Sequence, residues 1–189
     1  AARAFGPKET VARARCAVAE AEIALASRDL AWPSKALAAA SAILEAHGDQ
    51  VNAAHARYLE IRRLLLLGHL DEAEHGLARQ DLTALTPALR AIHELAVAGI
   101  SMRRVRAGAA QAALARAEEA ARWARIPALA AEVEQAFAIL EMPAARAIAR
   151  GAERPLLLAQ VEALLASKAL VIDACRNLVR ERNKVVPLA

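Results

Sequence analysis

Alanine fills more than a quarter of this 189-residue chain, and that abundance narrows the possible folds more than any other feature. Alanine has the highest intrinsic helix propensity, and leucine, arginine and glutamate follow it closely. Aromatic residues make up only 3% of the sequence, so helices must pack through small side chains. Seven glycines and seven prolines are few enough to act as separators between long helices. The composition therefore predicts an all-α fold.

Apolar residues recur at helical spacing along most of the chain. Ala14, Val18, Ala21 and Leu25, for example, fall at steps of four, three and four, which is one face of a helix. Glycine and proline mark where such stripes end and begin. We expect helices at about residues 9–28, 34–46, 50–67, 70–80, 87–107, 108–125, 127–142, 143–150 and 155–167.

The last twenty residues differ in character. The segments 170–173 and 184–188 are rich in β-branched residues, and Arg182-Asn183 resembles a turn. This pattern predicts two or three short antiparallel strands. We therefore divide the chain into a helical domain at 1–168 and a short C-terminal β-hairpin at 169–189.

Three segments, at 29–44, 68–77 and 108–117, share a register. In the second and third, a glycine ends one helix and an alanine lies five residues later, inside the next. Small side chains at such points let antiparallel helices approach, and each helix pair can then cover its neighbour. The aligned small or apolar positions are Ala36 and Ala40, Ala73 and Leu77, and Ala113 and Ala117.

The segment 67–73, which reads LGHLDEA, resembles the middle of a tetratricopeptide repeat. The resemblance covers about residues 10–125. It implies stacked antiparallel helix pairs, a tetratricopeptide-like α-solenoid, that binds protein or peptide through a concave face. Within that face Tyr58 and Arg62 would combine an amphipathic ring with a carboxylate-binding fork, although both also suit an ordinary core or surface position. The implied partner-binding residues are His55, Tyr58, Arg62, Met102 and Arg106.

The segments 170–173 and 185–188, with Arg176 and Val179 between them, resemble the opening sheet of a winged-helix DNA-binding domain of response-regulator type. In that family three helices follow the sheet, and one of them reads the major groove; they lie outside this chain. By this resemblance 169–189 is a fragment of such a domain. The alternative is a terminal hairpin that caps the last helix. The residues implied near the DNA backbone are Arg176, Arg180, Arg182 and Lys184.

Motifs for catalysis or metal binding are absent from the sequence. There is no glycine-rich phosphate loop, no HExxH and no paired CxxC. His69 and His75 flank acidic residues, but solvated positions at a helix start explain them better than a metal site. Cys16 and Cys175 do not form a disulfide framework, which favours a reducing cytoplasm. We expect no catalytic residues, no metal and no cofactor.

The cluster of Arg103, Arg104 and Arg106 has two interpretations. These cations suit the C-terminal end of a helix dipole, or they could hold an acidic partner; we favour the first. The net charge of +4 is too small and scattered to indicate nucleic acid by itself.

We therefore expect a non-catalytic interaction or sensor domain of a bacterial transcriptional regulator. It would bind a protein or peptide, form a homodimer and reach DNA only through helices outside this chain. No apolar run is long enough to span a membrane. The alternatives are a free-standing scaffold unrelated to DNA and an enzyme whose site carries no recognisable motif.

Overall fold

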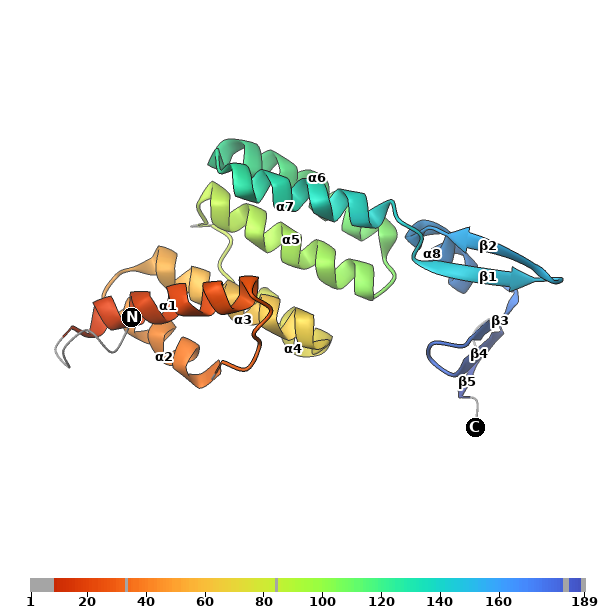
Figure 1. The fold of residues 1–189 in the computed structure, drawn as a ribbon, viewed down its shortest axis with the longest axis horizontal. Helices are drawn as coiled ribbons and strands as arrows, with labels where there is room; N and C mark the ends of the chain where they lie inside the picture. Colours follow the sequence, from red (N-terminus) through yellow and green to blue (C-terminus); the bar gives the residue numbers. More distant parts are fainter. Residues whose placement is uncertain (1–8, 33, 84, 182–183, 188–189) are drawn as a thin grey trace.

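The computed structural model describes residues 9–32, 34–83, 85–181 and 184–187, so the predicted turn at Arg182-Asn183 lies outside the described residues. The chain is mostly helical, with short antiparallel strands towards its C-terminal end (Figure 1). The elements are α1 (Thr10–Ala26), α2 (Ser34–Ala46), α3 (Gln50–Leu67), α4 (Leu70–Ala78), α5 (Pro87–Arg103), α6 (Ala107–Ala124), α7 (Pro127–Leu140), β1 (Ala145–Ala149), β2 (Ala152–Leu156), α8 (Leu158–Ala166), β3 (Leu170–Asp173), β4 (Leu178–Glu181) and β5 (Lys184–Pro187).

Helices α1 to α4, α6 and α7 begin and end within about two residues of the predicted positions, whereas α5 ends at Arg103 and not at 107. Local signals are visible at several of these ends. The Asp49 side chain accepts a hydrogen bond from the backbone N–H of Asn52, and Gly68 ends α3 in the left-handed conformation with φ of 82°. At α5, Thr86 accepts from the N–H of Leu89, and Pro87 occupies the first turn, where its lack of an N–H costs nothing.

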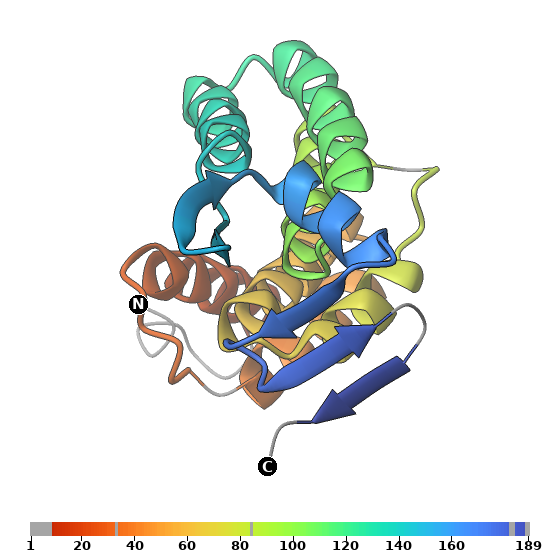
Figure 2. The same cartoon turned by 90° about the vertical axis from the view of Figure 1, so that its right-hand side faces the viewer.

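Helices α1 to α7 pack in a regular order. Each contacts the next along the chain, and α1 also contacts α3, α3 contacts α5, and α5 contacts α7. The odd-numbered helices therefore form a row of neighbours, which we call the inner row. Figures 1 and 2 show that α8 and the strands lie together at one end of this helical body.

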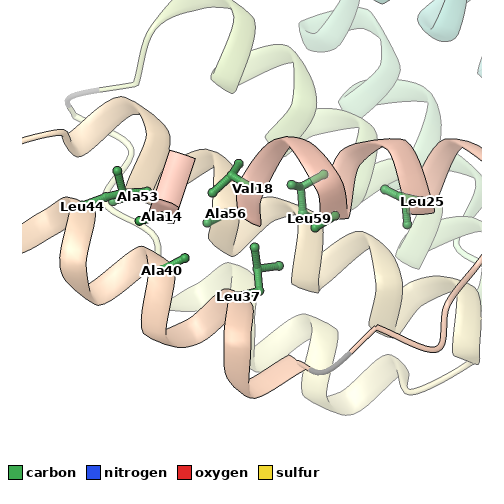
Figure 3. Packing of buried hydrophobic residues seen from close by; sticks show 10 residues of the cluster. Ala14, Val18, Leu25, Leu37, Ala40, Leu44, Ala53, Ala56 and Leu59 are labelled. Atoms are coloured by element: carbon green, nitrogen blue, oxygen red, sulfur yellow. The ribbon is translucent and has the colours of Figure 1, made fainter. Parts of the chain in front are cut away.

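The first three helices share a core of small and aliphatic side chains (Figure 3). The predicted stripe of Ala14, Val18, Ala21 and Leu25 is buried, which confirms the helical periodicity. The register assigned to the second helix is wrong at Ala36, which is exposed. The face that α2 buries against α1 and α3 is one residue further on, formed by Leu37, Ala40 and Leu44.

The α5–α6 pair is joined through small residues. Ala91 and Ala98 on α5 and Ala113 and Ala117 on α6 are fully buried. A Cβ atom on Gly99 would lie only 2.7 Å from Cδ2 of Leu65, so α3 approaches α5 too closely to admit even a methyl group without movement.

Gly108 does not break a helix, contrary to the sequence-based prediction. It lies in the first turn of α6, and the chain turns instead through Arg104, Val105 and Arg106. Val105 has φ of 57°, so a β-branched residue occupies the left-handed position that Gly68 fills after α3. The turn at residues 104–106 contains no glycine, which explains why the helix boundary was predicted at Gly108 instead.

The predicted helix at 143–150 is also wrong, because residues 145–156 form the β1–β2 hairpin. Arg150 and Gly151, with φ of 51° and 79°, are its two turn residues. Positive φ at both positions matches a type I′ turn, whose twist suits a hairpin. Pro155, predicted to open the last helix, lies in β2, and α8 begins at Leu158.

Strands β3, β4 and β5 form an antiparallel sheet in that order, which confirms the predicted C-terminal strands. Between this sheet and the inner row, α8 packs on α6 and β2. The Glu162 carboxylate of α8 accepts a 2.8 Å hydrogen bond from the backbone N–H of Ala107. No local side chain caps α6, so Glu162 caps it from another helix. Within the described residues, no helix combines the length and apolar character needed to cross a membrane.

Helices α3 and α6 each end at a residue with positive φ, and substitutions at these two residues should change the free energy of unfolding in opposite directions. Arg125 ends α6 with φ of 56° and is exposed, so Arg125→Gly should raise the free energy of unfolding by about 1 kcal/mol. Gly68→Ala should lower it by a similar amount, about 1 kcal/mol, through backbone strain alone, because a Cβ there meets no atom within 4 Å. Urea unfolding measures both. As the control, Gly108→Ala should stabilise the protein, since Gly108 is helical; destabilisation by this change would contradict the boundary described above.

The capping role of Glu162 predicts a local effect. Glu162→Ala should lower the free energy of unfolding by about 1 kcal/mol, because it removes a carboxylate from a helix N-terminus. Amide hydrogen exchange should quicken in the first turn of α6 and in α8, which loses its polar link to that helix. Glu134→Ala, at an exposed position of α7, serves as the control. Unchanged exchange in α6 would show that Glu162 is not its cap.

Candidate functional site

Two of the predicted partner-binding residues, both on α3, contact other helices of the inner row through polar groups. On α3, His55 lies 3.4 Å from the Glu22 carboxylate of α1, and Arg62 forms an ion pair with Glu132 of α7. These side chains remain partly exposed. An exposed ion pair such as Arg62–Glu132 contributes at most about 1 kcal/mol, and the His55–Glu22 contact is an ion pair only where the imidazole is protonated. The inner row therefore presents charged groups that another carboxylate or cation can engage at little cost.

Tyr58, also predicted for this surface, is instead part of the core. Its side chain is only 1% exposed and packs among Ala54, Ile61 and Leu65. The prediction of Tyr58 and Arg62 as a joint recognition pair is wrong, because the stripe that contains Tyr58 faces α4 and α5 while Arg62 faces α7.

Met102 and Arg106 lie apart from the other predicted residues. Half-buried Met102 lines an apolar groove with Ile139 and Leu158 at the far ends of α5 and α7. Arg106 lies 3.8 Å from Glu74 of α4. The structure therefore does not gather the predicted residues into one site.

The arginine cluster at the end of α5 binds α4. Arg104 forms ion pairs with Asp71 and with Glu74, the latter at 3.2 Å. Arg103 donates a hydrogen bond to the carbonyl of Gly99 in its own helix. These contacts favour the structural interpretation, in which the acidic partner is the first part of α4.

The hydroxyl of Tyr58 meets His93 of α5, and this pairing was not predicted. The oxygen lies 3.1 Å from Nδ1, and the rings meet edge to face with centroids 5.8 Å apart. Burial raises the pKa of Tyr58 to about 12, so its hydroxyl keeps the proton at neutral pH. Burial also lowers the pKa of His93, which favours the neutral ring.

The burial of Tyr58 fixes the direction of this hydrogen bond. Within the described residues His93 is the only hydrogen-bond partner of the Tyr58 hydroxyl, and a buried O–H proton left unpaired would cost about 1–3 kcal/mol. His93 Nε2 is not among the buried unpartnered atoms of the described residues, so the assignment that leaves no buried donor unpaired has the hydroxyl donate to Nδ1. A neutral imidazole that accepts at Nδ1 carries its proton on Nε2, so His93 has an N–H group free to donate on its other edge.

His93 lines a cleft of about 530 Å³ between α5, α6 and the chain segment before α5. Its apolar lining is Leu82, Leu85, Pro87, Ala120 and Trp123, and its polar lining is Arg90, His93, Glu94, Arg116 and Glu119. Glu94 and Arg116 form a 2.8 Å ion pair across the two helices. That pair raises the pKa of Arg116 and links the helices at the edge of the cleft.

The predicted DNA-backbone residues do not form one surface. Arg176 lies 3.5 Å from Asp173 in the β3–β4 connection. Arg180 is opposite Val185, whereas Lys184 is opposite Glu181, so alternation along the strands places Arg180 and Lys184 on different faces. Arg182 lies outside the described residues.

The remaining candidates have local roles. His69, the residue before α4, is exposed and lies 3.6 Å from Glu72, as expected for a solvated residue at a helix start. His75 is also exposed and hydrogen-bonds the carbonyl of Asp71, but it lies in the last turn of α4 and not at its start. Among the described residues no group of three or more metal-binding side chains converges. Cys16 and Cys175 are both free thiols.

Comparisons with protein-family models, with curated proteins and with solved structures find no match to this chain. The inner row and the cleft beside His93 are therefore interpreted from their own geometry.

The burial of His93 predicts a pH dependence of stability. Because folding lowers the pKa of His93 from 6.5, the unfolded chain takes up this proton first as the pH falls. The contribution of His93 to the free energy of unfolding is therefore complete above pH 6.5 and is lost as the pH falls below it. The total loss is ~1.4 kcal/mol for each pH unit by which folding lowers the pKa of His93. Thermal melts from pH 7.5 to 5 should show a smaller loss for His93→Asn, which cannot titrate. Parallel curves for the two proteins would exclude this contribution.

Proposed function

We propose that this chain is a non-catalytic interaction domain of a bacterial transcriptional regulator and that it binds a protein or peptide segment along the inner row. The packing order supports this proposal, because each helix from α1 to α7 contacts the next and successive odd-numbered helices contact one another, as in a tetratricopeptide-like α-solenoid. Such arrays present a continuous surface formed by the first helix of each pair.

The observation that carries the proposal is the arrangement of charges on that surface. Glu22 on α1, His55 and Arg62 on α3, and Glu132 on α7 form contacts between different helices of the row. An extended segment lying across these helices can exchange such exposed pairs for its own charged groups. Arg62 suits a carboxylate, because its guanidinium can donate two parallel hydrogen bonds.

The C-terminal sheet supports the regulator part of the proposal. Ile172, Val179 and Val186 lie directly opposite one another across the three strands, so they share one face. Ile172 and Val186 are 65% and 56% exposed. A sheet with an apolar face suits a winged-helix domain, in which helices cover it.

Peptide selection tests the binding function. A library of random peptides displayed on phage is selected against the immobilised protein, and the affinities of the synthesised peptides are measured by calorimetry. We expect acidic peptides whose affinity falls about tenfold in Arg62→Glu, since each 1.4 kcal/mol lost from a charge-assisted contact is a factor of ten.

Arg122→Glu is the matched control, because Arg122 is an exposed arginine of α6 outside the inner row. Peptides that bind the wild type and Arg122→Glu equally, but Arg62→Glu weakly, support the proposal. Equal binding to all three proteins, or a selection that enriches no peptide, would refute it.

A further inference from the structure

We propose that the cleft between α5, α6 and the leucines before α5, Leu82 and Leu85, is a binding site for a small ligand with a flat apolar body and one hydrogen-bond acceptor oxygen, a carbonyl or a carboxylate. Helix α5 belongs to both sites, but none of the residues that carry the peptide-binding proposal, Glu22, His55, Arg62 and Glu132, lines the cleft, so the two proposals can fail independently.

The donor of the site is the Nε2–H of His93. Tyr58 saturates Nδ1 and thereby fixes the proton on Nε2. Nε2 has no hydrogen-bond partner among the described residues, and His93 belongs to the cleft lining. The side chain is only 9% exposed, so this donor is held in place and largely shielded. An acceptor oxygen entering the cleft would pair it.

The apolar part of the ligand would contact Trp123 and the leucines before α5. Trp123 is 73% exposed although it belongs to a helix with a well-packed opposite face. Leu82 is likewise exposed, and Leu85 and Ala120 continue the apolar lining. Large rigid aromatic surfaces of this kind stack on flat ligands at low cost in side-chain entropy.

The fixed charges determine which acceptors the cleft tolerates. Arg116 is already neutralised by Glu94. Arg90 and Glu119 also line the cleft, and neither forms an ion pair with any described residue. These charges balance, so the cleft favours a neutral or singly charged ligand. Arg90, one helical turn before Glu94, lies on the α5 side and can accompany a single carboxylate.

The size of the cleft fits such a ligand. A volume of about 530 Å³ lies within the range of small-molecule sites and exceeds what one aromatic ring needs. A bicyclic carboxylate or carboxamide would therefore fill it better than a single ring.

Nuclear magnetic resonance titration of the full 189-residue protein with 2-naphthoate, 2-naphthamide and acetate tests the site. Both naphthyl compounds should cause saturable shifts of the Trp123 indole N–H and of the His93 ring nitrogens. Acetate, which lacks the apolar body, should cause none. Trp123→Ala should weaken naphthamide binding about tenfold without unfolding the protein, because Trp123 is exposed.

Tyr58→Phe separates the role of the His93 donor from simple hydrophobic binding. It removes the hydroxyl that fixes the imidazole proton, so the ¹⁵N shifts of His93 should change and naphthamide should bind several-fold more weakly. Arg122→Ala, one residue from Trp123 but absent from the cleft lining, should bind as the wild type. Shifts located elsewhere, equal binding of acetate, or unchanged affinity in Trp123→Ala would overturn the proposal.

Discussion

The close approach of helices through alanine and glycine is the constraint on which the rest of the structure depends. Gly99 has Leu65 so near that a methyl group would collide with it, and Ala98 and Ala113 are fully buried between neighbouring helices. Dispersion attraction strengthens steeply as atoms approach contact distance. Helices with small side chains can therefore gain packing energy by lying close together, although each side chain contributes little volume. Such close packing also restricts the register of each helix, because a shift by one residue would place a larger side chain where a methyl group now packs.

This packing also explains where the few large side chains lie. Tyr58 fills the space that the small residues of α3 and α5 leave open, and its hydroxyl then needs a partner away from water. His93 supplies that partner from α5. Because Nδ1 is used in the core, Nε2 is the nitrogen that His93 can offer to the cleft that it lines. The pairing that the buried Tyr58 hydroxyl needs thus leaves Nε2 of His93 as the nitrogen without a partner among the described residues.

The helix boundaries could be predicted most closely from the sequence where a helix ends at a residue with a recognisable conformational preference, such as glycine. For α3 the predicted and observed bounds agree, since Gly68 supplies the left-handed residue that the sequence displays. After α5 the same conformation is adopted by Val105, which carries no such signal. The β1–β2 hairpin was missed because its turn is Arg150-Gly151 and its strands are rich in alanine, which favours helices. The Tyr58–His93 pair joins residues from two helices, and only the tertiary packing brings them together.

Helix α6 connects the candidate cleft with the C-terminal part of the chain. Its second half contributes Arg116 and Trp123 to the cleft, and its first turn is capped by Glu162 of α8. The polar contacts along this helix differ in burial, because the Arg116–Glu94 ion pair is exposed, whereas the hydrogen bond from Ala107 to Glu162 is partly buried. Helix α8 contacts both α6 and β2, so α6 and α8 together join the cleft to the β1–β2 hairpin.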